Sequence, residues 1–359
     1  MQKGISVYFG LENSLSDNIE YMKSAKSLGF DRVFTSLHIP EADYKVLAKD
    51  IKIFLEEAKK LNMIVSCDIS NNAFEFLEIE KNNLASFKEM GVEILRLDFG
   101  FSEEEVAAFS NNDIGIKIEL NASTLTKKYL KKLDKHNPNY DNIIACHNYY
   151  PRNNTGISEE SLVIKNEIIQ DLGIEVSAFI PSLINKRGPV YEGLPTLEMH
   201  RNEKPYNSAR HLFALGCDNV YFGDAIAGYD ELKSVGSIKS SVELRADLFT
   251  INEEVLDLIN NNILTDRSDS ACDVVRAVEG RFNLKSVIEP ENNNIERKEG
   301  AITVDNKKYL RYMCELQICR KDLPKDDRIN VIGQIIDEDL FLIKYISDDV
   351  KFDIIKNNR

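Results

Sequence analysis

Eight short apolar segments, each followed by a longer amphipathic stretch, constrain the fold of this chain more than any other feature. The stretches between the segments, such as Asp17–Leu28 and Glu159–Leu172, repeat apolar residues every three or four positions, as amphipathic helices do. Three of the stretches lead into a glycine (Gly29, Gly91 and Gly173), a residue that tolerates the positive φ of a helix C-terminus. The segments are rich in β-branched and aromatic residues and predict strands at Ile5–Phe9, Val33–Leu37, Ile64–Ile69, Ile94–Phe99, Ile116–Leu120, Ile143–Asn148, Val176–Ile180 and Val220–Gly223.

This alternation predicts an α/β fold, a (β/α)8 TIM barrel, over residues 1–236. A doubly wound parallel sheet shows the same alternation and is the second choice, because the chain has no Gly-rich phosphate turn. After the seventh segment, residues 181–201 form an insertion that holds three of the nine prolines. An insertion after a barrel strand lies on the C-terminal face, where barrel enzymes carry their catalytic loops. We therefore expect residues 181–201 to be an active-site loop.

Residues 237–359 show a different pattern. A helical stretch is expected to about Asn262, and turn signals such as EPENNN and VDNKK then separate six short apolar segments. We predict a second domain over 237–359, a small antiparallel β barrel or sandwich with a leading helical segment. Its expected strands are Leu284–Ile288, Ala301–Val304, Tyr309–Cys319, Ile329–Ile336, Phe341–Ile346 and Val350–Ile355.

Composition disfavours several classes of function. The chain has 45 Lys and Arg against 59 Asp and Glu, a net charge of −14, and an acidic surface repels nucleic acid and anionic lipid. The N-terminus has no signal-peptide pattern, and no window approaches the ~18 apolar residues of a membrane span. We predict a cytoplasmic protein with no nucleic-acid or membrane partner. The six cysteines form no CxxC pair, which predicts reduced thiols, and the sequence implies no cofactor; the oligomeric state stays open.

Carboxylates stand where four of the predicted strands end. They are Asp68, Asp98, Glu119 and Asp224. Burying a carboxylate at a barrel mouth is costly without a partner, and barrel enzymes take catalytic residues from the ends of several strands. We predict that these four are the catalytic candidates, with Asp98 and Glu119 on neighbouring strands as the first pair and the other two in reserve. The structural alternative is that some of them bond loop amides or cap helices.

Alternation along the strands places two cations beside these acids. Residues two apart point to the same side of a strand, so Arg96 shares a side with Asp98, and Lys117 with Glu119. If the carboxylates point into the barrel, both cations lie beneath them and help to keep at least one carboxylate ionised. A Schiff-base role for Lys117 is the alternative. We predict no metal, although His, Asp and Glu from several strand ends can assemble a metal site without local spacing.

Basic and aromatic residues follow the sixth and seventh strands. Arginines in these loops can converge on a phosphate or a carboxylate and bind it bidentately, and the tyrosines offer ring surfaces to a sugar. His147 and Asn148 are expected to orient the sugar or a carboxylate. The predicted substrate-binding residues are His38, Asn121, His147, Asn148, Tyr149, Arg152, Arg187, Glu192 and Arg201.

Several strings of the sequence resemble the MupG-type 6-phospho-N-acetylmuramidases. They are GISVYFG (4–10), FTSLHIPE (34–41), LRLDFGF (95–101), HNYYPRNNTG (147–156), RGPVYEGLPTLEMHR (187–201) and FGDA (222–225), with DNKKYLRYMCELQI and RINVIG in the C-terminal part. The resemblance implies a TIM barrel joined to a cyclophilin-like β domain. It also implies a cytoplasmic enzyme of cell-wall recycling that splits 6-phospho-N-acetylmuramyl-N-acetylglucosamine, a phosphorylated amino-sugar disaccharide. NNTGIS after YYPR departs from the family pattern, which leads us to expect a proline or acidic residue and a leucine there.

The leading hypothesis is therefore glycoside hydrolysis. One carboxyl group protonates the leaving oxygen, and a second acts as nucleophile or activates water. Asp98 and Glu119 are the expected pair. The alternatives are a sugar-phosphate lyase or isomerase that uses Lys117, and a non-catalytic carbohydrate-binding protein built on the C-terminal domain. In the leading hypothesis the 6-phosphate or the lactyl carboxylate is bound by Arg152, Arg187 and Arg201.

Overall fold

The structure is a computed structural model. It describes residues 1–36, 44–70, 74, 79–80, 83–97, 100–240, 242–291 and 295–357. The chain divides into two compact units, Met1–Ser237 and Ile238–Arg359. Each unit is described by itself.

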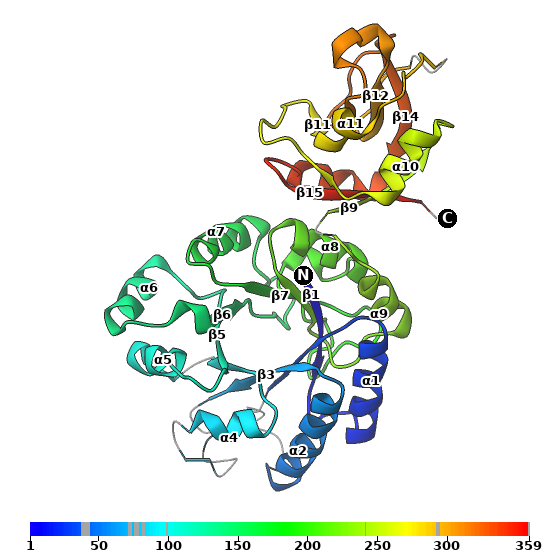
Figure 1. Ribbon diagram of the computed structural model, residues 1–359. Coiled ribbons are helices and arrows are strands. Elements are labelled where there is room, and N and C mark those ends of the chain that lie inside the picture. The colour runs from blue at the N-terminus through cyan, green and yellow to red at the C-terminus, as the bar shows by residue number, and fades with distance from the viewer. Residues whose placement is uncertain are drawn as a thin grey trace. The chain divides into compact units, whose positions relative to one another are not determined.

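The first unit is a closed barrel of eight parallel strands in the order of the sequence (Figure 1). β1 pairs with both β2 and β8, which closes the barrel. This arrangement confirms the predicted TIM barrel. The strands are β1 (Gln2–Val7), β2 (Arg32–Ser36), β3 (Ile64–Ile69), β4 (Ile94–Leu97), β5 (Lys117–Asn121), β6 (Ile143–Cys146), β7 (Val176–Ile180) and β8 (Asn219–Phe222).

Helices surround the barrel on its outside (Figure 1). Ser14 and Ser102 each begin a helix with a capping box, in which the serine hydroxyl accepts from the backbone N–H three residues later and that residue's carboxylate accepts in return. The predicted glycine stops at Gly29 and Gly91 have positive φ. The helices are α1 (Leu15–Ser27), α2 (Tyr44–Lys60), α4 (Leu84–Glu89), α5 (Glu103–Ser110), α6 (Lys127–Leu133), α7 (Glu159–Gln170), α8 (Pro205–Ala214) and α9 (Tyr229–Gly236), with 3-10 turns η1 (Asp134–His136), η2 (Tyr140–Asn142) and η3 (Glu198–His200).

The barrel interior divides into a polar half and an aromatic half. Strand register sets Ser36 beside Asp68, Asp68 beside Arg96 and Arg96 beside Glu119, so β2 to β5 carry a band of polar side chains. Strands β2, β7 and β8 and the residue after β1 contribute a buried cluster that includes Tyr8, Phe34, Phe179 and Tyr221, against which Tyr149 packs. The polar side chains of β2 to β5 and this buried aromatic cluster therefore share the interior of the barrel.

The second unit is a seven-stranded sheet in the order β10-β15-β9-β14-β12-β13-β11. All its strand pairs are antiparallel except β9 with β15. A bridge between Asp266, next to β10, and Ala277 of β11 makes the sheet nearly closed. The elements are β9 (Glu243–Leu248), α10 (Glu253–Asn261), β10 (Leu264–Thr265), β11 (Val274–Ala277), α11 (Val278–Asn283), β12 (Ala301–Asp305), η4 (Lys307–Tyr312), β13 (Leu316–Cys319), β14 (Ile329–Ile335), η5 (Asp337–Tyr345) and β15 (Lys351–Lys356).

This unit confirms the predicted β domain but corrects several of its segments. The expected leading helix contains strand β9, and Leu284–Ile288 is irregular. The expected strand Phe341–Ile346 falls largely within the 3-10 segment η5, which buries Asp339 and Leu342, and the first part of Tyr309–Cys319 is also a 3-10 turn. Short apolar runs cause such errors, because periodicity alone does not separate a buried strand from a buried helical turn.

Candidate active site

Two of the predicted site residues, His38 and Asp98, lie outside the residues that the structure describes. The other predicted residues fall into three groups. Some lie inside the barrel, some are used to build the loops at its mouth, and one arginine faces a cavity there.

Glu119 lies deep in the barrel beside Arg96. Its side chain is completely buried, and Arg96 Nη1 lies 3.3 Å from its Oε1 atom. Arg96 also donates to the Cys146 carbonyl at 3.0 Å and to Asn148 Oδ1 at 2.5 Å. Burial raises the pKa of Glu119, and the positive charge of Arg96 opposes that rise. The Arg96–Glu119 pair therefore holds Asn148 in place from below the mouth.

Asp68 stands on the neighbouring strand and differs from Glu119 in exposure. It is half-buried, and Ser36 Oγ donates to its Oδ2 atom at 3.3 Å. The register places it level with Arg96. Asp68 is less buried than Glu119, although its Oδ1 atom is itself enclosed by the protein.

Lys117 corrects the prediction of a second buried cation. It is the first residue of β5 and is exposed, and its ammonium group donates to the carbonyl of Asp141 in the turn that precedes β6. A residue at the start of a barrel strand lies at the end opposite the active-site mouth. The sugar-phosphate lyase or isomerase that would use Lys117 as a Schiff base is therefore not supported.

Asp224 orders the loop after β7. Its carboxylate is completely buried and accepts backbone N–H groups of Ser182 at 2.8 Å, Arg187 at 2.8 Å and Leu194 at 3.3 Å. Burial raises the pKa of Asp224, and these three hydrogen bonds oppose that rise. Glu231 binds the same loop through the Ser182 hydroxyl. The loop predicted at 181–201 is thus fixed to the end of β8.

Arg187 has its guanidinium group stacked on two tyrosine rings. Its Cζ atom lies 4.2 Å from the centre of the Tyr8 ring and 5.1 Å from that of Tyr149. Nη1 is 3.2 Å from the Tyr149 hydroxyl, whereas Nε is buried and has no hydrogen-bond partner among the described residues. Tyr8 is itself held by a 2.8 Å hydrogen bond to the Gly223 carbonyl. Arg187 is therefore a fixed cation with an unused donor.

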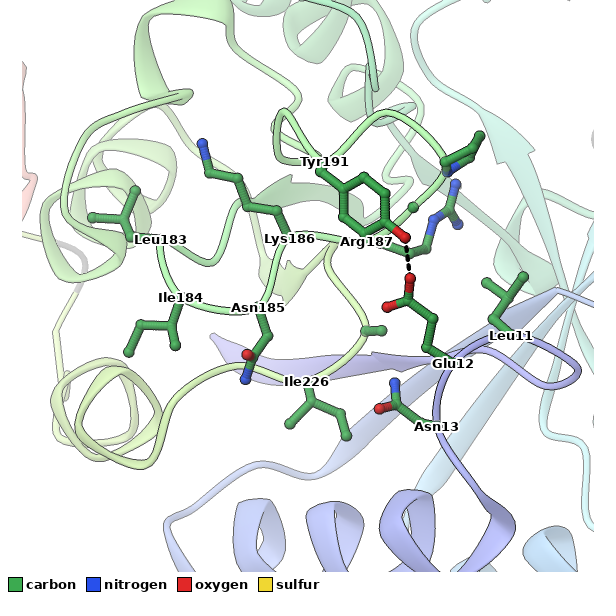
Figure 2. A pocket seen from close by; sticks show the side chains of 13 residues that line it. Leu11, Glu12, Asn13, Leu183, Ile184, Asn185, Lys186, Arg187, Tyr191 and Ile226 are labelled. Atoms are coloured by element: carbon green, nitrogen blue, oxygen red, sulfur yellow. Dashed lines mark hydrogen bonds between the residues drawn. The ribbon is translucent and has the colours of Figure 1, made fainter.

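A cavity of about 870 Å³ opens beside Arg187 (Figure 2). Its walls come from the loops after β1, β7 and β8, which meet at the C-terminal mouth of the barrel. Figure 2 shows Tyr191 and Glu12 facing each other across it, joined by a hydrogen bond. Its lining residues are Leu11, Glu12, Asn13, Leu183, Ile184, Asn185, Lys186, Arg187, Gly188, Pro189, Tyr191, Ala225 and Ile226.

Arg201 is used inside the protein, contrary to the prediction that it binds phosphate. It is only 3% exposed, and Nε and Nη2 form a bidentate pair with Glu198 at 2.7 and 2.6 Å. Its remaining donors contact the carbonyls of Tyr150, Gly193 and Arg152 at 2.9–3.0 Å. These contacts leave no N–H group for a ligand.

Glu198 completes this junction between two loops. It also accepts the N–H groups of Asn154 at 2.9 Å and Gly156 at 2.7 Å, and the adjacent Arg201 lowers its pKa to about 2. Glu192 makes a similar contact, because it accepts the Asn153 N–H at 2.8 Å. Arg152 contributes its carbonyl to the junction while its side chain is exposed.

The His147 ring is enclosed by the protein. It is completely buried, with Nδ1 3.1 Å from Ser123 Oγ and Nε2 2.9 Å from Asn166 Oδ1. Burial lowers its pKa to about 4, so the ring is neutral at pH 7. Asn121 contacts the same turn, since its Oδ1 accepts the Ser123 N–H at 3.1 Å. In this structure His147 has no free nitrogen for a substrate.

Sequence reasoning missed two features. Tyr8 and Glu12 help to form the mouth, and the signal for them is their place at and after the end of the first strand. The second feature is a local cluster of lysines, the run KKYLKK (127–132) and Lys135, which the negative net charge of the chain does not indicate. These five lysines are exposed and line a surface cavity of about 470 Å³ on and beside α6. They are Lys127, Lys128, Lys131, Lys132 and Lys135.

Searches for a metal site and for a membrane-crossing helix were negative in the part of the chain that the structure describes. No group of three or more His, Cys, Asp or Glu residues with metal-binding geometry occurs there. None of the described helices combines the length and the apolar character that crossing a membrane requires.

Comparison with known proteins decides the family. The N-terminal model of 6-phospho-N-acetylmuramidase matches residues 3–237, and the C-terminal model matches residues 242–355. The chain belongs to the 6-phospho-N-acetylmuramidase family. It is therefore an enzyme, a glycosidase, and its family implies a phosphorylated muramyl sugar as substrate.

Two solved structures resemble the whole of this family member. An uncharacterized Bacillus cereus protein is 31% identical with a TM-score of 0.81, and the match covers 99% of both chains. A conserved Enterococcus faecalis protein of unknown function is 34% identical with a TM-score of 0.65, covering 100% of this chain and 97% of the other. No curated protein sequence matches the chain significantly.

Proposed function

We propose that this protein hydrolyses the glycosidic bond of 6-phospho-N-acetylmuramyl-N-acetylglucosamine in the cytoplasm, as a step of cell-wall recycling. The observation that carries the proposal is Arg187, a fixed cation with an unused donor beside an 870 Å³ cavity at the barrel mouth. Membership of the family supports the same substrate, because the family name specifies a phosphorylated muramyl sugar.

In this proposal, Arg187 binds the 6-phosphate. Arginine presents N–H groups in a planar fork that matches the oxygens of a phosphate, and because Nε is buried here, the Nη groups of Arg187 are the ones that meet the phosphate in this proposal. Tyr8 and Tyr149 stack on the guanidinium group, and Asp224 holds the Arg187 backbone N–H at 2.8 Å. The cation is thus positioned before substrate arrives, which reduces the entropy cost of binding.

We propose that Asp68 and Asp98 perform the acid/base chemistry and that Glu119 is a positioning residue. Glu119 is completely buried against Arg96, which keeps it from touching a sugar, whereas Asp68 is half-buried on the adjacent strand. Asp98 follows Arg96 by two residues at the end of the fourth predicted strand, the position from which barrel enzymes take catalytic groups. Glycoside hydrolysis needs two such carboxyl groups.

The test is to incubate the purified protein with the phosphorylated and the unphosphorylated muramyl disaccharide and to identify the products by mass spectrometry. We expect the phosphorylated disaccharide to yield its two sugars with addition of one water, and the unphosphorylated one to remain largely intact. An Asp68→Asn variant serves as the inactive control. Failure to cleave the phosphorylated disaccharide, or equal cleavage of both, contradicts the proposal.

A further inference from the structure

The second unit contains a cavity of about 460 Å³ that the proposed hydrolysis does not use. Its walls are formed by the connection between β10 and β11, by α11, by Glu315 at the start of β13, and by Asp349 before β15. All of these residues belong to the 238–359 unit, so the cavity is complete within that unit.

Glu315 lines this cavity and has an unsatisfied acceptor. The residue is 8% exposed, and its Oε1 atom has no hydrogen-bond partner among the described residues. Nη1 atoms of Arg267 and Arg276 lie 3.7 and 3.9 Å from it, distances that give ion pairs but not hydrogen bonds. Nε of Arg276 is also buried without an acceptor in the described part of the chain. A buried acceptor left without a partner is unfavourable, and a ligand hydroxyl that donates to Glu315 would satisfy it; Arg276 is not one of the lining residues.

The charges around the cavity favour a neutral ligand. Its lining carries two guanidinium groups and three carboxylates, and the Arg267 guanidinium is already paired with Asp269 at 2.8 Å. A phosphate or a carboxylate would meet more negative than positive charge there. A sugar hydroxyl, in contrast, donates to a carboxylate and accepts from a guanidinium at the same time.

An exposed ring lies at the edge of the same cavity. Phe282 of α11 lines the cavity and is 69% exposed. An aromatic ring in this position offers a flat apolar surface on which the C–H face of a pyranose can pack, while the polar groups beneath bind hydroxyls. We propose that this cavity is a non-catalytic binding site for a neutral pyranoside sugar, separate from the barrel site.

Isothermal titration of the full-length protein with the β-1,4-linked trisaccharide of N-acetylglucosamine tests this site. The probe carries no phosphate, so it lacks the group that Arg187 is proposed to bind at the barrel site. We expect binding that weakens about tenfold in Phe282→Ala and in Glu315→Gln. Phe249→Ala is the matched control, because Phe249 is 57% exposed in the same unit but outside the cavity. Both phenylalanine side chains are exposed, so neither substitution disturbs the core.

The result distinguishes this site from the barrel. Unchanged affinity in Phe249→Ala and in Arg187→Ala, with weaker binding in Phe282→Ala, supports the site in the second unit. Absence of binding, equal affinity in Phe282→Ala and the parent, or displacement of the sugar by inorganic phosphate overturns it. None of these measurements depends on turnover of the muramyl disaccharide, so the outcome is independent of the proposed hydrolysis.

Discussion

Replacing Arg187 and Arg201 one at a time separates an arginine that meets substrate from one that builds the loop. Both belong to the predicted 181–201 insertion. Arg187 lines the cavity at the barrel mouth, whereas the N–H groups of Arg201 are bonded to Glu198 and to backbone carbonyls. We expect Arg187→Ala to change specificity and Arg201→Ala to change stability.

The contacts give the size of each effect. Two Nη N–H groups of Arg187 can form charge-assisted hydrogen bonds to a phosphate, each worth ~1.5–3 kcal/mol. Losing both removes about 3 kcal/mol or more, which lowers kcat/KM for the phosphorylated disaccharide about 10²-fold or more. Removing Arg201 instead leaves the Glu198 carboxylate without its partner, and breaking a buried pair costs ~3–5 kcal/mol. Because Glu198 is 30% exposed, we expect the lower part of that range.

The assay measures kcat/KM on both muramyl disaccharides and the free energy of unfolding in urea. Arg187→Ala should reduce kcat/KM for the phosphorylated substrate only, with a small effect on unfolding. Arg187→Lys is the matched control, since it keeps the charge but not the planar fork, and it should recover only part of the loss. An equal loss on both substrates would place Arg187 outside the phosphate site and refute the reasoning.

Three further predictions follow from the site. Asp68→Asn should lower kcat about 10²-fold or more with little change in the free energy of unfolding. Glu119→Gln should instead lower the free energy of unfolding by about 3 kcal/mol. The reverse pattern would mean that Glu119 is the catalytic residue and Asp68 the structural one. Asp224→Asn should raise KM for the phosphorylated disaccharide more than it lowers kcat, because the loop that carries Arg187 loses its anchor; unchanged KM counts against this. Burial lowers the pKa of His147 to about 4 from an ordinary 6.5, so on acidification the unfolded chain binds a proton at this residue before the folded chain does. The contribution of neutral His147 to the free energy of unfolding is therefore complete above pH 6.5 and decreases as the pH falls toward 4. Urea unfolding at pH 7 and pH 5 should show a smaller loss for His147→Gln than for the parent, while exposed His136→Gln should match the parent.

The barrel could be predicted from the sequence because its signal is repeated eight times, so an error at one strand boundary leaves the count unchanged. The second unit offers no such repetition. There, the apolar run Phe341–Ile346 has the composition of a strand, yet most of it lies in a 3-10 segment in which Asp339 binds Arg245 bidentately at 3.0 and 2.6 Å. That contact joins residues 94 positions apart, and no local pattern reports it.

The same limit applies to the site. Alternation predicts Arg96 inside the barrel, and its Nη1 atom does lie there, 3.3 Å from Glu119 Oε1; the pairing of these two residues comes from the register between β4 and β5, which alternation within one strand does not give. The prediction that Lys117 is buried is wrong, although Lys117 lies on the same side of the strand as Glu119. Lys117 is the first residue of β5, and its long side chain extends out of the barrel to the carbonyl of Asp141. Composition likewise did not separate Arg187 from Arg201. The one available signal was the spacing of Glu198 and Arg201, since a 3-10 turn brings residues three apart into contact.

The contacts of each strand-end carboxylate determine whether it is suited to a structural role or to acid/base chemistry. The oxygens of Asp224 are committed to three backbone N–H groups, so transferring a proton to or from them would break the loop that they hold. Glu119 faces Arg96 inside the barrel, where protonation would remove a negative charge that offsets the buried guanidinium group. Asp68 accepts from the Ser36 hydroxyl and is less buried than Glu119 and Asp224, so a change in its protonation is expected to cost less than a change in theirs. These contacts support the proposal that Asp68, rather than Glu119 or Asp224, takes part in acid/base chemistry, while Asp224 holds the loop that carries Arg187.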